Sequence, residues 1–569
     1  MADDRGHKIT SMLLKRHLWR INVWMVPLIF FLLAKCRAAE WQWSVPVDSV
    51  ALQNSAEHPR AFLWIPPDCQ KVRAVVVGQN NMIEEGILQH AVFRREMARL
   101  GIAEIFIAPT FDTWQSLTNN DLVNQKFNAL LRCVARESGY RELEFAPVIP
   151  LGHSAMASYP WNFAAWNPGR TLAILSVHGD APQTTLVGNG RPNVEWAGRT
   201  IDGIPGLMVM GEYEWWEDRL TPAFTFRGAH PAAPIAFLAD VGHGHFDYSD
   251  DLVRFLAMFI RKAVAARLPA SQMTAGPVQL KPVDPAQGWL VERWHPEASR
   301  RAKSAPLAEY TGDSGTAFWA FDREMAKATE NFNSQCGHAP QLVGFVQDGK
   351  IVPQTDTHQQ VNLNFAPQND GVTFHLQACF LDAVPGGSKN PSKWTGLSAG
   401  SPLGHATGGG SVKISRISGP VEQLSADTFA VRFNRSSIPA DRRMGDIWLL
   451  ASQPGDAHFK SAVQQALLKI PLKLQDGMEQ HITFPEIADV KEGIQKIKLH
   501  ATSDAGVPVY FYVREGPAEV DGDTLHLTRI PPRAIFPIKV TIVAWQYGRS
   551  VEPKLKSAEL VVQTFQIVK

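Results

Sequence analysis

Residues 147–159 read PVIPLGHSAMASY, and this stretch decides how the first half of the chain is interpreted. The run from Pro147 to Leu151 is apolar and suits a buried strand. Gly152 and His153 end that run, and the small residues after Ser154 are compatible with a helix. A strand that turns sharply into a helix would place Ser154 at the apex of the turn. Its hydroxyl would then stand clear of the sheet, near the positive end of the helix dipole.

Apolar runs and helix-compatible segments alternate on both sides of this stretch, between residues 60 and 270. The apolar runs show almost no alternation with polar residues, as buried strands of a parallel sheet require. This order predicts an α/β fold, a doubly wound and mostly parallel sheet. The expected strands are residues 61–65, 74–77, 105–108, 148–151, 172–177, 206–210 and 235–239, and the expected helices are 84–100, 122–135 and 252–268.

Length and composition bound the class of protein. The chain has 569 residues, too many for a single domain, and 45% hydrophobic with 20% charged residues is a globular composition. The formal net charge of +1 argues against a dedicated nucleic-acid surface.

Acidic residues and histidines follow two of the later expected strands. Residues 211–218 read GEYEWWED, and residues 240–247 read DVGHGHFD. A serine nucleophile needs a base, and the base needs a carboxylate that orients it. The glycines of the second loop allow it to bend so that an imidazole can reach the serine.

A metal site is the other interpretation of the histidine loop. His243 and His245 could bind a metal ion, with His178 or Asp180 as a third ligand. The turn at Ser154 explains a histidine here without any metal, so we expect neither a metal ion nor a cofactor.

The serine turn, the acidic loop and the histidine loop, in this chain order, resemble those of the α/β-hydrolase superfamily. The resemblance covers residues 60–268 and is to secreted bacterial serine hydrolases. It implies that Ser154 is the nucleophile. Glu214 would be the acid, with Glu212 as the alternate, and His245 would be the base, with His243 as the alternate.

The same resemblance implies where an oxyanion hole would lie. One backbone N–H would come from Ala155, the residue after the nucleophile. The other would come from Gln79 or Asn80, in the loop that follows the expected strand at residues 74–77.

Two residues depart from the pattern of the family. Met156 lies two residues past the serine, where the G-x-S-x-G motif has a small residue. Pro160 falls early in the following helix and is expected to distort its second turn. A non-catalytic, degenerate hydrolase domain, part of an exported binding or adhesion protein, is therefore an alternative.

The substrate is expected to be a carboxylic ester on a carbohydrate or another extracellular polymer. Residues 178–203 lie where many lipases insert a lid, but they contain no convincing amphipathic helix. An open site suits a bulky or polymer-attached ester. Trp215 and Trp216, beside the expected acid, could stack on sugar rings. A serine peptidase is the enzymatic alternative.

The N-terminus has the pattern of a signal peptide over residues 1–38. Lys15, Arg16 and Arg20 precede an apolar run at residues 23–34, which is short for a transmembrane span. We therefore expect export to the periplasm, the cell surface or the medium, with membrane attachment only if the segment is not cleaved.

The remaining boundaries follow from shifts in pattern. We expect the hydrolase domain at 40–270, a linker with a docking helix (residues 313–333) at 271–340, and a β-rich domain at 341–473. Short alternating runs predict an immunoglobulin-like β-sandwich at 474–569.

Four cysteines follow the expected signal peptide. They would permit the disulfides Cys69–Cys133 and Cys336–Cys379, or they are inert thiols.

Overall fold

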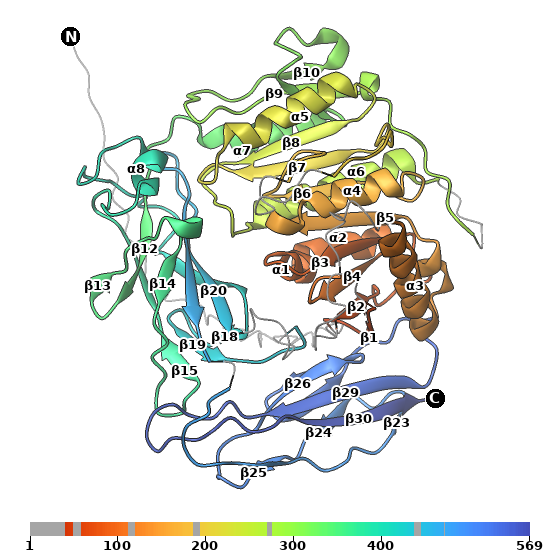
Figure 1. Cartoon of the computed structure of the whole chain (residues 1–569), viewed down its shortest axis with the longest axis vertical. Coiled ribbons are helices and arrows are strands. Elements are labelled where there is room, and N and C mark those ends of the chain that lie inside the picture. The colour runs from red at the N-terminus through yellow and green to blue at the C-terminus, as the bar shows by residue number, and fades with distance from the viewer. Residues whose placement is uncertain are drawn as a thin grey trace, which may run out of the picture. The chain divides into compact units, whose positions relative to one another are not determined.

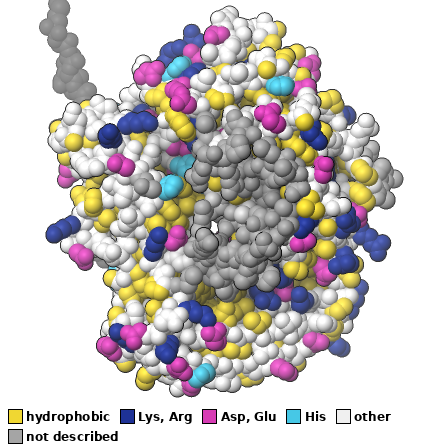
Figure 2. Space-filling model, in the orientation of Figure 1, with side chains coloured by type: hydrophobic (Ala, Val, Ile, Leu, Met, Phe, Trp, Pro, Cys, Tyr) yellow, Lys and Arg dark blue, Asp and Glu magenta, His cyan; other side chains and the backbone are white. Residues whose placement is uncertain are grey.

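The computed structural model describes residues 40–48, 59–111, 120–185, 194–269, 276–436, 445–471 and 473–569. The expected signal peptide lies outside the described residues. The described residues belong to one compact unit. On the face that Figure 2 presents, acidic and basic side chains are interspersed, in keeping with the small net charge.

The first half of the chain is built on an eight-stranded sheet with the order β1-β2-β4-β3-β5-β6-β7-β8 (Figure 1). Its strands are β1 (Trp43–Pro46), β2 (Arg60–Trp64), β3 (Ala74–Gln79), β4 (Ile102–Ala108), β5 (Val148–His153), β6 (Ile174–Val177), β7 (Gly206–Gly211) and β8 (Ile235–Asp240). Only β2 runs antiparallel to its neighbours, and every pair from β4 to β8 is parallel. The expected doubly wound, mostly parallel sheet is confirmed.

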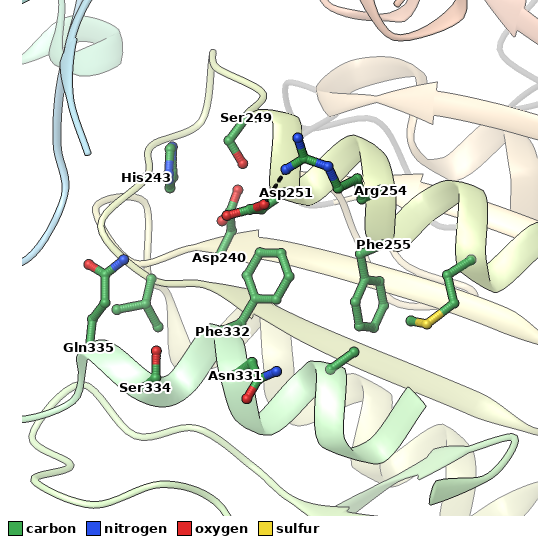
Figure 3. Close-up of a pocket in the computed structure, with 13 residues that line it drawn as sticks. Asp240, His243, Ser249, Asp251, Arg254, Phe255, Asn331, Phe332, Ser334 and Gln335 are labelled. Atoms are coloured by element: carbon green, nitrogen blue, oxygen red, sulfur yellow. Dashed lines mark hydrogen bonds and ion pairs between the residues drawn. The ribbon is translucent and has the colours of Figure 1, made fainter. Parts of the chain in front are cut away.

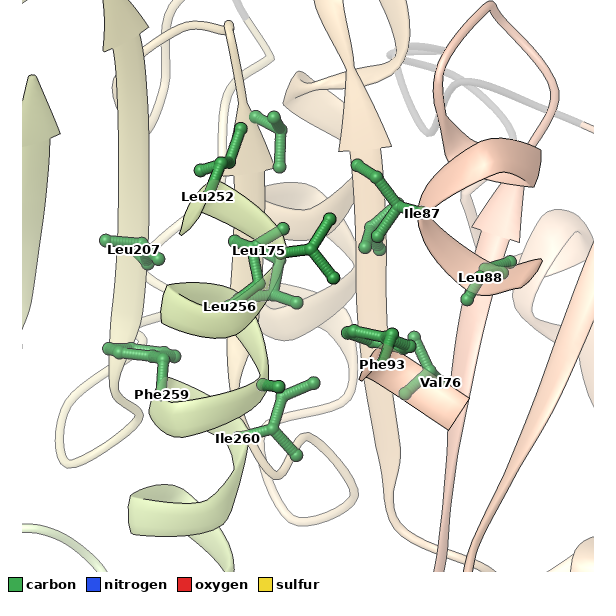
Figure 4. Packing of buried hydrophobic residues seen from close by; sticks show 14 of the residues in the cluster. Val76, Ile87, Leu88, Phe93, Leu175, Leu207, Leu252, Leu256, Phe259 and Ile260 are labelled. Carbon is green, nitrogen blue, oxygen red and sulfur yellow. The ribbon is translucent and has the colours of Figure 1, made fainter. Parts of the chain in front are cut away.

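Helices cover both faces of this sheet. One face carries α1 (Glu84–Gln89), α2 (Ala91–Leu100) and α6 (Asp250–Arg267), and the other carries α3 (Asn120–Ser138), α4 (Ser158–Trp166) and α5 (Glu217–Ala229). Figure 4 shows Leu252 and Leu256 of α6 and Ile87 of α1 packed over Leu175 and Leu207 of the strands. Burial of such side chains, at roughly 1.5–3 kcal/mol each, is what fixes the sheet and with it the ends of its strands.

The expected helix at residues 84–100 is two helices. The chain leaves the helical conformation at His90, where ψ is 130°, and the His90 ring caps α2 by accepting from Val92 N. The first helix therefore stays short and keeps its N-terminal turn beside the end of β3.

Residues 271–340 contain more strand than expected. Their elements are β9 (Trp289–Glu292), β10 (Ser304–Pro306), β11 (Ala317–Ala320) and α7 (Arg323–Phe332). The single helix expected at 313–333 is wrong at its start, because residues 317–320 pair with β9 and Asp322 caps a shorter helix. That helix packs on α6, where Lys262 Nζ lies 2.5 Å from the Asp322 carboxylate.

The middle region is β-rich and forms three small sheets. Their elements are β12 (Val343–Gln347), β13 (Lys350–Ile351), β14 (Val361–Leu363), β15 (Thr373–His375), β16 (Gln377–Phe380), β17 (Lys413–Ser418), β18 (Val421–Gln423), β19 (Thr428–Val431), β20 (Asp446–Gln453) and β21 (Ala462–Lys469), with the short helix α8 (Asn390–Thr395). One core of buried side chains joins these sheets.

The C-terminal region is also β-rich. Its elements are β22 (Ile482–Thr483), β23 (Val490–Lys491), β24 (Lys496–Lys498), β25 (Thr502–Ser503), β26 (Tyr510–Glu515), β27 (Ala518–Asp521), β28 (Thr524–Leu527), β29 (Ile538–Trp545) and β30 (Val561–Val568). The sheets β23-β30-β29-β26 and β24-β28-β27 share a buried core. The strand pairing was expected to be antiparallel throughout, but β23 runs parallel to β30.

The four cysteines after the N-terminal segment are free thiols, so the suggested disulfides are not formed. Burial raises the pKa of the Cys69 thiol to about 11. Within the described ranges, none of the helices has both the length and the apolar character needed to cross a membrane.

Candidate active site

Ser154 occupies a strained turn at the carboxyl end of β5. Its φ is 53°, in the left-handed region that residues with a side chain rarely adopt. The turn continues as a 3-10 turn over Ser154–Met156, and α4 begins at Ser158. The expected strand, sharp turn and helix are all present, with the serine at the apex.

The two departures from the family's motif are accommodated in this turn. Pro160 falls in the first turn of α4, where its missing N–H would have no helical acceptor, so the expected distortion of the second turn is wrong. A Cβ at Gly179 would lie 1.9 Å from that of Ala157. The close approach that the motif needs is therefore made by Ala157 against Gly179, and Met156 need not be small.

The structure brings Ser154, His245 and Glu214 together. Ser154 lies at the end of β5, while Glu214 and His245 lie in the loops that follow β7 and β8. The Ser154 hydroxyl donates to His245 Nε2 over 2.6 Å, and His245 Nδ1 donates to Glu214 Oε2 over 2.5 Å. A hydroxyl, an imidazole and a carboxylate in this order can move a proton off the hydroxyl.

The two alternate residues have other partners. His243 bonds Asp247 and, with Asp240, lines a separate pocket of about 400 Å³ between α6 and α7 (Figure 3). Burial lowers the pKa of His243, but Asp240 and Asp247 outweigh it and raise the pKa to about 10. Glu212 pairs with Lys460 and accepts from Gly242 N instead.

The Glu214 carboxylate is surrounded by donors and is only 5% exposed. Oε2 accepts from His245 and from Arg219 Nη2 at 2.6 Å, and Oε1 accepts from His178 Nδ1 at 2.6 Å and Gly211 N at 2.9 Å. Burial would raise the pKa of Glu214, but Arg219, His245 and His178 hold it well below its usual value. This carboxylate is therefore ionised, and its two oxygens fix two imidazole rings.

His245 is kept neutral by its surroundings. Burial lowers its pKa, and Arg219 and His178 add to this effect against the opposing charge of Glu214. Burial also holds the pKa of the neighbouring His153 well below its usual value. A neutral His245 with its Nδ1 proton on the carboxylate leaves Nε2 free to accept a proton.

Glu84 is a buried carboxylate whose role the sequence pattern does not reveal. It accepts three backbone N–H groups, from Asn81 at 3.0 Å, Met82 at 2.8 Å and His153 at 2.9 Å. It therefore ties the loop after β3 to the end of β5, directly before Ser154. In the sequence it reads as an ordinary acidic residue in the first turn of a helix.

His178 and Arg219, which hold Glu214, were also missed in this role. From the sequence, His178 was expected only as a possible third ligand of a metal ion. It directly follows β6, so its position at the same end of the sheet was the available signal. Arg219 lies in the first turn of α5 and has no comparable signal.

Of the three backbone N–H groups expected to contribute to an oxyanion hole, one already donates to a carbonyl within the chain. The N–H of Asn80 donates to Ile107 O over 2.8 Å, so the expectation for that amide is wrong. The side chain of Gln79 accepts from Phe111 N at 2.9 Å and thereby holds the loop after β4. The backbone amides of Gln79 and Ala155 remain predictions.

The two tryptophans beside Glu214 differ in how far their side chains are exposed. Trp215 is buried between Phe237 and Trp294, so the expectation that it stacks on substrate is wrong. Trp216 is 43% exposed and remains a prediction.

The β-rich region packs directly on the acidic loop. The Tyr213 hydroxyl donates to Ser461 O over 2.9 Å, Trp394 Nε1 donates to Tyr213 O over 2.7 Å, and Lys460 Nζ lies 2.6 Å from Glu212. These contacts join residues about 180 to 250 positions apart, and no local pattern announces them. The two residues directly before Glu214 are thus held partly by the second half of the chain.

No family model and no curated protein matches this sequence. Among solved structures, a fluorophosphonate-binding serine hydrolase of Staphylococcus aureus is 13% identical, and the match covers 39% of this chain and 98% of that one with a TM-score of 0.29. An S-formylglutathione hydrolase from Agrobacterium tumefaciens is 14% identical, covering 39% and 94% with a TM-score of 0.29. A poly(3-hydroxybutyrate) depolymerase from Bordetella parapertussis is 15% identical, covering 40% and 92% with a TM-score of 0.27. The strand order and the turn at Ser154, rather than these scores, identify the α/β-hydrolase fold.

The close approach at Gly152 yields a test of the turn. A Cβ at this position would lie 2.1 Å from Met156 O, so Gly152→Ala should destabilise the fold by about 1–3 kcal/mol. Gly228→Ala is the control, since nothing lies within 4 Å of a Cβ there and a helical alanine should stabilise by about 0.5–1 kcal/mol. Denaturant unfolding measures both. Equal stability of the two variants would contradict the packing described.

Burial raises the pKa of Glu84 to about 7, against the opposing pull of its three N–H donors. A carboxyl whose pKa is higher folded than unfolded binds its proton more tightly in the native state, so its contribution to stability falls as pH rises from about 4.5 to 7. Glu84→Gln removes this dependence. The difference in the free energy of unfolding between the parent and this less stable variant should therefore shrink by roughly 3 kcal/mol from about pH 4.5 to 7.

Urea unfolding of the parent and Glu84→Gln at several pH values measures this deficit. Glu297→Gln, at a carboxylate that is 79% exposed, controls for the loss of one charge. A deficit that stays constant from pH 4.5 to 7 would show that Glu84 does not hold its proton in this way.

Proposed function

We propose that this protein is a serine hydrolase that cleaves a carboxylic ester through an acyl-enzyme intermediate. The observation that carries the proposal is the continuous contact from the Ser154 hydroxyl through His245 to the ionised Glu214. The lowered pKa values of Glu214 and His245 support the proposal, because they favour an ionised carboxylate and a neutral imidazole, and each of the three groups comes from a different strand end.

In this mechanism Ser154 Oγ attacks the ester carbonyl carbon while His245 Nε2 takes the hydroxyl proton. His245 then gives that proton to the alcohol oxygen as the carbon–oxygen bond breaks, which leaves the acyl group on Ser154. Water attacks the acyl carbon with His245 again as base, and the carboxylic acid departs. Glu214 keeps Nδ1 protonated and stabilises the imidazolium, and the Ala155 N–H supports the oxyanion.

The substrate we propose is an ester on a carbohydrate or another extracellular polymer. The exposed ring of Trp216, two residues past Glu214, supports this because an exposed indole can stack on a sugar face. The expectation of an open site depends on residues 178–203. The structure describes this segment except for residues 186–193.

Two further expectations from the sequence stay part of this proposal. The basic and apolar pattern of residues 1–38 supports export to the periplasm, the cell surface or the medium. The two small sheets over one core at 474–569 support an immunoglobulin-like sandwich that binds, spaces or tethers.

A fluorophosphonate probe tests the proposed nucleophile. The purified chain should be labelled stoichiometrically, Ser154→Ala should not be labelled, and His245→Gln should react at least 100-fold more slowly. His243→Gln is the matched control, because this histidine lies two residues away and bonds Asp247 instead. Peptide mapping by mass spectrometry locates the label. A folded parent that takes up no probe would favour the exported binding protein instead.

Glu214→Gln should lower the labelling rate by about 10³–10⁴, since an amide cannot hold both imidazoles in the required tautomer. Glu212→Gln, the same substitution two residues away, is the control. It should keep most of the labelling rate because the Glu212 carboxylate pairs with Lys460. The acid assignment fails if the two variants react at similar rates.

The labelling rate should rise with pH as His245 loses its proton, with a midpoint below 6.5 because its pKa is lowered. Arg219→Gln removes a cation that lowers this pKa, so the midpoint should move upward. Rates of inactivation from pH 4.5 to 8.5 measure both. A parent midpoint above 7, or no shift in the variant, would contradict the electrostatic account.

A further inference from the structure

The pocket between α6 and α7 holds a buried carboxylate that the proposed reaction does not use. Asp240, the last residue of β8, lines this pocket of about 400 Å³ and is only 1% exposed. Neither of its carboxylate oxygens has a hydrogen-bond partner among the described residues. In Figure 3 the carboxylate points from the end of the strand toward Ser249 and Asp251. A buried carboxylate without donors is costly, so a molecule that brings donors to this place would be bound.

The carboxylate of Asp240 also leaves the pocket with a negative charge. Burial raises the pKa of Asp240 to about 6, against the opposing effect of His243, so the group is ionised at neutral pH. Of the two cations that line the pocket, His243 is bonded to Asp247. The other, Arg254, is bonded to Asp251. The pocket therefore attracts a further cation.

The rest of the pocket supplies an apolar wall. Phe255 and Met258 come from α6, and Phe332 comes from α7. The rings of Phe255 and Phe332 meet edge to face, with their centroids 5.6 Å apart. Such a wall binds an apolar body, and aromatic rings also attract a cation. The volume suits a small organic molecule.

The two open oxygens of Asp240 indicate the kind of cation. A planar amidinium or guanidinium group offers two parallel N–H donors, one for each oxygen of a carboxylate. An ammonium group is a point charge without this fork. A metal ion fits less well, because the described part of the chain has no group of three or more His, Cys, Asp or Glu side chains that could hold one.

The entrance to the pocket can open. Asp251 and Arg254 line the pocket and form an ion pair in which both side chains are exposed. Exposed pairs contribute little to stability, so these side chains can move aside at small cost. A ligand can in this way reach the covered oxygens of Asp240.

We propose that this pocket binds a small organic cation in which an amidinium or guanidinium group is attached to an apolar body. The charged group bonds both carboxylate oxygens of Asp240, and the body lies against the two phenylalanine rings. None of Ser154, Glu214 and His245 lines this pocket, so the site does not depend on the proposed function.

Binding to the full chain tests the site. Benzamidine is the first probe, agmatine, which has a guanidinium group on an aliphatic chain, is the second, and benzamide is the neutral isostere of the first. Isothermal titration calorimetry near neutral pH should give one site for benzamidine, with a Kd of about 1 mM or tighter. Benzamide should bind about tenfold more weakly or not at all, because it lacks the charge and the second N–H group.

Three variants locate the binding. Asp240→Asn keeps the shape of the side chain but removes its charge and adds donors of its own, so benzamidine should bind about tenfold more weakly or less. Its melting temperature checks that it folds. Phe332→Ala shortens the wall of the pocket and should weaken binding by roughly threefold to tenfold, which keeps the test decisive if the first variant does not fold. Asp521→Asn, at an exposed carboxylate on β27, is the control and should bind as the parent does.

Four results would overturn the proposal. The first is equal binding of benzamide and benzamidine, and the second is unchanged binding of benzamidine in a folded Asp240→Asn or in Phe332→Ala. The third is a parent that binds neither benzamidine nor agmatine at concentrations up to about 10 mM. The fourth is calcium chloride alone raising the melting temperature of the parent but not of Asp240→Asn, which would make this a metal site. Fluorophosphonate labelling at Ser154 bears only on the proposed function.

Discussion

The site depends on one buried carboxylate and the four donors around it. Glu214 accepts from two histidines, one arginine and one backbone N–H, which come from the loop after β8, the end of β6, the start of α5 and the end of β7. An ionised carboxylate is too costly to bury unless it is neutralised and fully bonded, so these elements must meet at one point. The position of the imidazole that faces Ser154 follows from that requirement.

The turn at the serine depends on a second buried carboxyl group, that of Glu84, whose pKa is raised and not lowered. Glu84 binds the loop after β3 to the end of β5, and the backbone at Gly152 passes too close to Met156 for a side chain. Ser154 is thereby kept in a conformation that a side chain disfavours. Strain at one residue is retained because its neighbours leave no alternative.

The sequence was sufficient wherever local pattern and chain order carried the information. Continuous apolar runs marked the parallel strands, and the order of serine, acid and histidine led to the three residues that the structure brings together. The resemblance already favoured Glu214 over Glu212 and His245 over His243, and the folded chain adds the physical reason, because the two alternates bond other residues.

Other features could not be read because they are set by distant residues. Trp215 looked like a stacking platform, yet Trp294 covers it. The amide of Asn80 looked like a free turn amide, yet it pairs with β4. The contacts of Tyr213 with Ser461 and Trp394 had no signal at all, since neither partner lies in a recognisable motif.

The proposed function requires that Ser154 carries the acyl group during turnover. Rapid mixing with p-nitrophenyl acetate, followed by acid quench and peptide mass analysis, tests it most directly. We expect a burst of about one equivalent of nitrophenol per chain and an acetyl group on the peptide that contains Ser154. Turnover without a burst, and with no acetyl group on that peptide, would contradict it.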